Sequence, residues 1–189
     1  MSRAVAPAPA VSSSPFSPDT VLAAPGPLVQ IHLGPDGLPS LAVAATCMAA
    51  TPARVWAVIS DVGSYAGRVP MMDRVRKDGD RVTVGLRFKV ALFSVRFEFV
   101  ADVHREEGRL LEIRGISGEP RGLRLRFDLA PLEGGRETMV HATAEIDVRS
   151  LGWLAKYFLG HHPEIQHGIL PGVTLALLDA MRKIAEAGG

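Results

Sequence analysis

Between residues 70 and 149, apolar and polar residues alternate in short segments. The alternation is clearest at 123–129, where leucine and phenylalanine alternate with arginine and aspartate, and at 140–148, where valine, alanine and isoleucine occupy every second position. Such alternation is typical of strands with one buried and one exposed face. Turn residues with hairpin spacing separate the segments, at 78–79, 106–108, 117–120 and 133–135. We therefore predict six strands in this part of the chain.

A helix is predicted to begin at Thr51-Pro52. The threonine hydroxyl can cap the helix, and proline is tolerated at the first helical position because no partner is needed for its missing N–H. The helix should run to about Ser60 and bury an apolar stripe that includes Trp56, whose presence core packing alone explains. A short second helix or turn is expected over 63–69, before Pro70.

The longest predicted helix closes the chain. Its apolar residues recur at steps of four and three, namely Ile165, Ile169, Val173, Leu177, Met181 and Ile184. The stripe continues across Pro171-Gly172, where we expect a kink and no termination. Only this helix is long enough to cover the apolar face of the sheet. The predicted fold is α+β, a helix grip in which a curved antiparallel sheet of about seven strands wraps a long C-terminal helix, with two short helices after the first strand.

Three regions of the chain differ in composition. Residues 1–27 are rich in proline, alanine and serine and are interpreted as a flexible tail, since they carry too little apolar surface to offset the entropy of ordering. Residues 28–39 hold a candidate extra edge strand at 28–33 and a turn at 34–37. The domain itself is expected over 40–189.

Composition and charge exclude several classes of protein. A chain of 189 residues with 47% hydrophobic content suits one domain. The formal charge of +1 provides no strong field for nucleic acid, so nucleic acid is not an expected partner. A single cysteine, Cys47, excludes an internal disulfide and favours a reducing compartment. We find no signal-peptide pattern and no membrane-spanning stretch, so the expected location is the cytoplasm.

The segment 51–65, TPARVWAVISDVGSY, followed by Val69-Pro70, resembles the opening of the polyketide cyclase/dehydrase and lipid-transport group. This group lies within the START-like, or SRPBCC, superfamily. The resemblance covers about residues 40–187 and implies the helix-grip fold. It does not select an activity, because similar proteins include lipid carriers, receptors, quinone-binding proteins and aromatase/cyclases. Many relatives place an aromatic residue just before the Val-Pro pair, whereas this chain has Ala66-Gly67-Arg68, which puts a cation near the pocket mouth.

Ligands of the superfamily lie between the sheet and the terminal helix. By matching elements, the resemblance implies that ten residues line such a pocket: Val90, Phe97, Phe99, Ile113, Leu125, Phe127, Ala142, Ala144, Val173 and Leu177. The small inward-facing residues Ala101, Gly115, Ala142 and Ala144 favour a cavity. The alternative is a core filled by the large residues Phe88, Phe97, Phe99 and Phe127.

Evidence for catalytic or metal chemistry is sparse. No catalytic residue is predicted, and the secondary candidates are Asp61, Tyr65 and Arg68, beside the expected opening. His161, His162 and His167 are secondary metal candidates. However, five helical steps turn roughly 140° between His162 and His167, unlike the four-residue spacing of helical zinc motifs. We therefore predict no metal and no cofactor. The register places His104 and His141 on the outer sheet face, in solvent.

Three hypotheses of function follow. The first is binding or transfer of a hydrophobic small molecule, such as a lipid, an isoprenoid quinone or a polyketide, without enzymatic activity. The second is a polyketide aromatase/cyclase-type enzyme, which requires polar groups inside the pocket. The third is a regulatory or partner-docking domain without a ligand. The apolar segment 151–159 is expected either to pack under the sheet or to make transient contact with a membrane surface. No oligomeric state is predicted.

Overall fold

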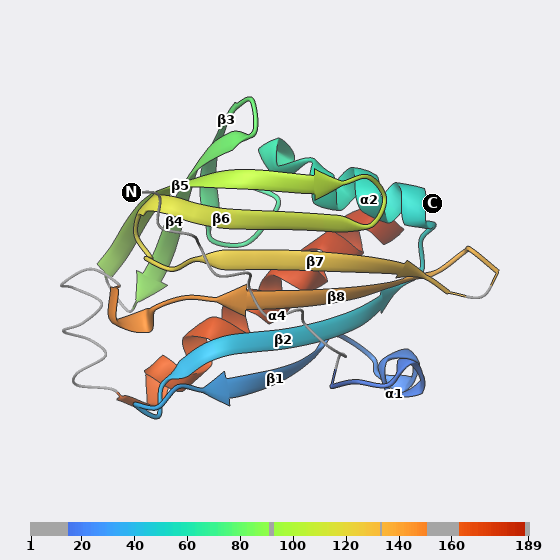
Figure 1. The fold of residues 1–189 in the computed structure, drawn as a ribbon, viewed down its shortest axis with the longest axis horizontal. Helices are drawn as coiled ribbons and strands as arrows, with labels where there is room; N and C mark the ends of the chain where they lie inside the picture. Colours follow the sequence, from blue (N-terminus) through green and yellow to red (C-terminus); the bar gives the residue numbers. More distant parts are fainter. Residues whose placement is uncertain (1–14, 91–92, 133, 151–162, 188–189) are drawn as a thin grey trace, which may run out of the picture.

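A curved antiparallel sheet of eight strands forms the frame of the molecule, in the order β1-β2-β8-β7-β6-β5-β4-β3 (Figure 1). The computed structural model describes residues 15–90, 93–132, 134–150 and 163–187. The strands are β1 (Leu28–Leu33), β2 (Pro39–Met48), β3 (Met72–Asp78), β4 (Arg81–Val90), β5 (Phe93–Glu106), β6 (Leu110–Gly118), β7 (Arg124–Pro131) and β8 (Thr138–Glu145). The predicted helix-grip α+β fold is confirmed. The sheet has eight strands where about seven were predicted, because residues 28–33 pair with β2 as a further edge strand.

Two short helices after β2 and a long final helix follow the predicted order, and two further short helices were not predicted. The helices are α1 (Pro18–Ala23), α2 (Pro52–Ser60), the short 3-10 helices η1 (Val62–Tyr65) and η2 (Val148–Ser150), and α4 (Pro163–Glu186). The Thr51 side chain caps α2 by accepting a hydrogen bond from the Arg54 N–H at 3.4 Å, and Trp56 is buried as predicted. The final helix, α4, continues through Pro171, so the proline does not end it.

The segment interpreted as a flexible tail contains the short helix α1. The Ser17 hydroxyl caps it by accepting a hydrogen bond from the Thr20 N–H at 3.2 Å. Val21 is 2% exposed and packs with Ala45 and Met139, on the outer face of the sheet. Ser17-Pro18 is the same kind of helix start as Thr51-Pro52, but it lies in a proline-rich segment, and a tertiary contact supplies the apolar burial that this segment lacks alone.

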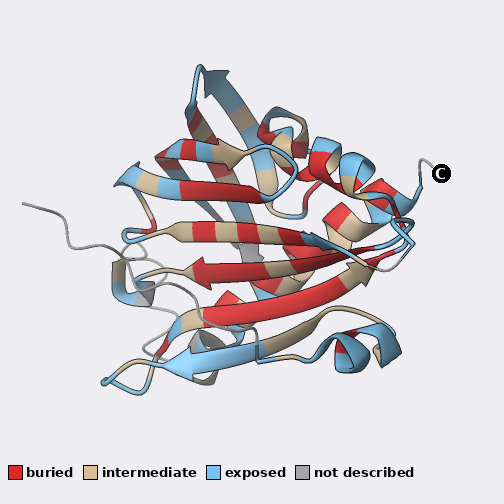
Figure 2. Ribbon diagram, turned by 45° about the vertical axis from the view of Figure 1, so that its right-hand side comes forward, coloured by how far each residue is buried: buried red, intermediate tan, exposed pale blue. Residues whose placement is uncertain are grey.

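The helix α4 lies across the inner face of the sheet, and its C-terminal end is held in place by hydrogen bonds. It packs mainly on β1, β2, β8 and α2. The Arg54 guanidinium donates to the carbonyl oxygens of Ile184 at 3.4 Å and Ala185 at 3.5 Å, which a helix end otherwise leaves without partners. The Ala49 N–H donates to the Glu186 carboxylate at 3.0 Å. Buried residues concentrate on the central strands beneath the helix (Figure 2).

A close approach between β5 and β6 requires glycine at position 118. Gly118 has φ +92°, and a Cβ there would lie 2.2 Å from the Glu98 carbonyl oxygen and 2.6 Å from the Phe99 Cα. We expect Gly118→Ala to lower the free energy of unfolding by more than about 2 kcal/mol, since backbone strain and a clash with backbone atoms add together. Denaturant unfolding measures this loss.

The matched control is Gly108→Ala in the turn between the same two strands. Gly108 also has a positive φ, +67°, but a Cβ there meets no atom within 4 Å. Backbone strain alone should lower the free energy of unfolding of Gly108→Ala by about 1 kcal/mol. Equal losses in the two variants would contradict the role of the close approach.

Candidate functional site

An apolar cavity of about 100 Å³ lies between the inner face of the sheet and α4. Its wall is formed by side chains from η1, from strands β3 to β8 and the segments next to β7 and β8, and from residues 169–177 of α4. The helix packs mainly toward β1, β2 and β8, so the inner face of the remaining strands is less completely covered. Of the small residues expected to favour a cavity, Ala144 lies in the described wall, where it leaves space that a larger side chain would fill, whereas Ala101, Gly115 and Ala142 do not line it.

Seven of the ten residues predicted as pocket-lining lie in the wall of this cavity, namely Phe97, Phe99, Ile113, Leu125, Ala144, Val173 and Leu177. Phe127 and Ala142 are buried in the core, at 0% and 1% exposure, and are not part of the wall. The side chain of Val90 lies outside the described residues. Phe97 and Phe99, which were expected either to line a pocket or to fill the core, border the cavity.

The wall also contains residues that sequence reasoning did not place there. Leu123 and Ile146 continue the alternation of Leu125 and Ala144, and Ile169 precedes Val173 by one helical turn, so the pattern already carried a signal for them. Leu86 lies directly opposite Phe97 in the β4–β5 pair. The contributions of Val62 and Met72 depend on how η1 and the start of β3 fold over the sheet, which no local pattern indicated.

Two polar side chains, Tyr65 and Thr174, lie in the cavity wall, and each donates its proton to a backbone carbonyl. The Tyr65 hydroxyl donates to the Ile59 carbonyl oxygen, and the Thr174 hydroxyl donates to the Leu170 carbonyl oxygen at 2.8 Å. Burial raises the pKa of Tyr65 far above its usual value, and the negative charge of Asp61 adds to this shift. None of the described lining residues is charged. The described wall therefore offers shape and apolar contact, with no charged group.

The structure does not gather the secondary catalytic candidates at one point. Tyr65 is 1% exposed and lines the cavity. Asp61 and Arg68 are exposed, and neither belongs to the cavity wall. An acid–base site needs such groups within hydrogen-bond reach of one substrate, an arrangement that these three residues do not provide.

The metal candidates also gain no support from the part of the chain that the structure describes. His167 is exposed on α4, and His161 and His162 lie outside the described residues. Among the described residues, no group of three histidine, cysteine, aspartate or glutamate side chains is placed to hold a metal ion. The segment 151–159, predicted to pack or to touch a membrane, also lies outside them. No helix within the described ranges has the length and apolar character to cross a bilayer.

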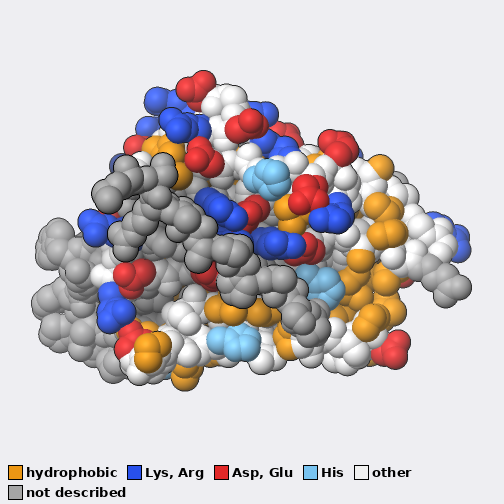
Figure 3. Space-filling model, viewed as in Figure 1, with side chains coloured by type: hydrophobic (Ala, Val, Ile, Leu, Met, Phe, Trp, Pro, Cys, Tyr) orange, Lys and Arg blue, Asp and Glu red, His pale blue; other side chains and the backbone are white. Residues whose placement is uncertain are grey.

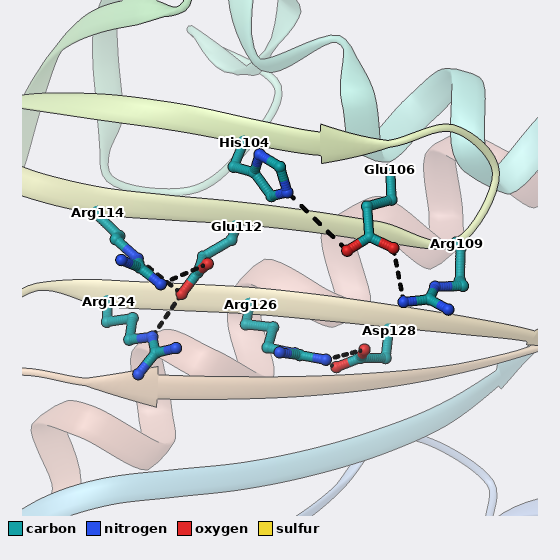
Figure 4. Close-up of polar contacts among 8 residues, drawn as sticks. All are labelled: His104, Glu106, Arg109, Glu112, Arg114, Arg124, Arg126 and Asp128. Atoms are coloured by element: carbon teal, nitrogen blue, oxygen red, sulfur yellow. Dashed lines mark hydrogen bonds and ion pairs between the residues drawn. The ribbon is translucent and has the colours of Figure 1, made fainter. Parts of the chain in front are cut away.

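The outer face of the sheet carries a network of ion pairs (Figure 4). The Glu112 carboxylate, 7% exposed, accepts hydrogen bonds from Arg124 at 2.5 Å and from Arg114 at 3.0 Å. Arg126 contacts Asp128 through two nitrogens, at 2.6 and 2.7 Å. Arginine and acidic side chains are intermixed on this face (Figure 3). Opposite charges on this face therefore pair with one another, and removal of one partner would leave a partly buried charge uncompensated.

The two histidines predicted in solvent differ in their surroundings. His104 is 65% exposed and lies 3.9 Å from Glu106, as expected for the outer face. His141 also occupies this face, between Ala45 and Asp128 on the neighbouring strands, but it is half-buried. Burial lowers its pKa, and the charge of Asp128 opposes this shift. The prediction of full solvent exposure was therefore wrong for His141, because neighbouring side chains cover the middle of the sheet.

Comparison with known proteins identifies relatives of this fold. A sequence model described as polyketide cyclase / dehydrase and lipid transport matches residues 41–162. The comparison with curated proteins found no match. Among solved structures, TTHA0849 from Thermus thermophilus is similar at 14% identity and a TM-score of 0.57, over 78% of this chain and 97% of its own.

Two further structures share the fold at low identity. The Zhui aromatase/cyclase from Streptomyces sp. R1128 is 19% identical, with a TM-score of 0.51, over 79% of this chain and 98% of its own. A START superfamily protein from Mycobacterium smegmatis is 15% identical, with a TM-score of 0.50, over 71% and 99% respectively. At these identities the likeness concerns the fold alone.

The Glu112 network predicts a specific loss of stability in acid. Burial alone would raise the pKa of Glu112, but hydrogen bonds from Arg114 and Arg124 outweigh it and hold the pKa below its usual value. The Glu112 ion pairs therefore stabilise the protein fully at a pH above the pKa that Glu112 has in the unfolded chain. This stabilisation is lost as the pH falls through the lower pKa that Glu112 has in the folded protein. Glu112→Gln should lower the free energy of unfolding by about 1–2 kcal/mol at pH 7, and by less as the pH falls below about 4.

Glu106→Gln is the matched control for this prediction. Its carboxylate also contacts an arginine, Arg109 at 2.6 Å, but is 43% exposed, so its removal should cost less than about 0.5 kcal/mol. Denaturant unfolding across the acid range compares the two variants. A loss in Glu112→Gln that does not change with pH would contradict the assignment.

Proposed function

The chain belongs to the polyketide cyclase / dehydrase and lipid transport family, and from this membership we propose that it binds or transfers a hydrophobic small molecule. The ligand is a lipid, an isoprenoid quinone or a polyketide, held between the sheet and α4. One observation carries the proposal, namely a cavity whose described wall contains no charged side chain and only two polar ones. Apolar burial is then the main source of affinity.

The size of the cavity bears on how a ligand is held. About 100 Å³ is well below the roughly 300 Å³ at which typical ligand pockets begin, so a large ligand requires displacement of part of the wall. Hydrogen bonds to Arg54 and Ala49 fix the C-terminal end of α4. The cavity is bordered by residues closer to the N-terminus of α4, namely Ile169, Val173 and Leu177. Expansion should therefore involve the half of α4 that contains Pro171, where one helical hydrogen bond is missing.

A cyclase-type enzyme is the alternative within the same family. Such an enzyme needs groups that transfer protons at the reacting atoms. In the described wall, the Tyr65 and Thr174 hydroxyls already donate to backbone carbonyls, and Tyr65 resists ionisation. These observations support binding over catalysis.

Native mass measurement of the protein purified gently from its own host tests the proposal. Extraction with organic solvent, followed by identification of the released compound, names the ligand class. A stoichiometric apolar adduct is the expected result. A mass equal to that of the chain alone, unchanged after incubation with lipid and quinone mixtures, would overturn the proposal.

Filling the cavity should weaken binding without unfolding the protein. Val173 lies in the wall and is only partly buried, so Val173→Phe adds volume toward the cavity with little strain elsewhere. We expect it to weaken binding of the neutral fluorescent probe N-phenyl-1-naphthylamine at least about tenfold, or about 1.4 kcal/mol. Fluorescence titration measures the affinity.

Leu175→Phe is the matched control on the same helix. Leu175 is also partly buried but does not line the cavity, so the probe should bind this variant as it binds the wild type. Equal affinities in wild type, Val173→Phe and Leu175→Phe would place the probe outside the cavity.

A further inference from the structure

The two edges of the sheet differ in charge. The edge strand β3 carries Asp73, Arg74, Arg76 and Lys77, all of them exposed. Charged side chains on an edge strand oppose pairing with another strand. The other edge strand, β1, has the sequence LVQIHL, with no lysine, arginine, aspartate or glutamate and no proline. It therefore lacks the usual protection of an exposed edge.

The strand β1 also exposes apolar side chains. Ile31 is 37% exposed and Leu33 is 54% exposed, and they are two of only four large hydrophobic residues at this level of exposure among the described residues. Ile31 lies opposite the fully buried Ala42 in β2, so it belongs to the inner face of the sheet, but at the rim it remains 37% exposed. Figure 2 shows β1 as a mostly exposed strand at the rim of the molecule.

The outer edge of β1 is open to pairing. Its single strand neighbour within the described part of the chain is β2, which takes the hydrogen-bonding groups of one edge only. Backbone N–H and C=O groups on the other edge are therefore available to a further strand. A strand that pairs with this edge must be short and uncharged, and it must place apolar side chains beside the exposed apolar residues of β1.

We propose that β1 pairs antiparallel with β1 of a second copy of this chain, so that two sheets join across a two-fold axis. With Ile31 at the axis, Ile31 lies opposite its own equivalent and Val29 lies opposite Leu33 of the other copy. On the outer face, Gln30 lies opposite His32. Apolar side chains thus meet apolar ones, and polar side chains meet polar ones, in one register. A second copy always supplies an uncharged strand with this alternation, and a two-fold pair uses the same edge of both copies.

The same contrast between the edges limits the assembly to two copies. A dimer through β1 leaves only the β3 edges free, and their charges oppose further pairing. The register shift between His32 and Leu33 and the six-residue length of β1 keep the contact small. The dimer should therefore dissociate on dilution.

Sedimentation velocity over a wide range of protein concentrations tests the proposal. The mass should approach twice the 20.2 kDa of one chain as concentration rises. Ile31→Lys places a charge at the axis and should raise the dimer dissociation constant at least about tenfold. Ile116→Lys is the matched control, because Ile116 is 48% exposed but lies on β6, away from both edges.

A cross-link provides a second test that does not depend on the stability of the lysine variant. Ile31→Cys should form a disulfide between subunits under mild oxidation, since the two residues lie face to face at the axis. Leu22→Cys, on α1 and 49% exposed, should not. A chain that stays monomeric at all concentrations, or a dimer that Ile31→Lys leaves unchanged, would overturn the proposal.

Discussion

One long helix has to cover the apolar face of an eight-stranded sheet, and this mismatch in size governs the rest of the structure. The helix α4 packs closely on β1, β2 and β8, where it meets small residues such as Ala42 and Ala44. It leaves the inner face of the other strands to be covered by η1 and by large side chains such as Phe97 and Phe99. The cavity lies where these two kinds of cover meet. Its position is thus a consequence of the fold, and its size depends on the aromatic side chains that border it.

The anchoring of α4 is uneven along its length. Arg54 and Ala49 hold its last residues through hydrogen bonds, and Thr51 fixes the helix from which Arg54 extends. The cavity-facing half contains Pro171, and Leu170 and Thr174 form their own hydrogen bond across it. The C-terminal end of α4 is fixed, whereas the part that lies over the cavity contains Pro171. Movement of that part would enlarge the cavity while the sheet stays intact.

Much of this arrangement could be predicted because it repeats along the chain. The family resemblance implied ten pocket-lining residues by matching elements, and seven of them lie in the cavity wall. Four of the seven, Leu125, Ala144, Val173 and Leu177, also follow the alternation in β7 and β8 and the stripe on α4. Phe127 lies on the predicted face but packs in the filled part of the core, since periodicity gives the face of a residue and not its depth. Ser17-Pro18 carries the same helix-start signal as Thr51-Pro52. The packing of α1 and the half-burial of His141, however, depend on contacts between distant segments, for which no local signal exists.

The chemistry of the wall limits the ligand that it can hold. A buried polar group without a hydrogen-bond partner costs about 1–3 kcal/mol, and the Tyr65 and Thr174 hydroxyl protons are already engaged. A ligand with a polar group deep in the cavity would leave that group unsatisfied unless it could donate to one of these two oxygens. The described wall therefore favours a ligand that is apolar along its buried length and keeps any polar end at the opening. Discrimination among such ligands rests on length and shape, where a single methylene contributes only about 1 kcal/mol, so the cavity is suited to a class of compounds and not to one member of it.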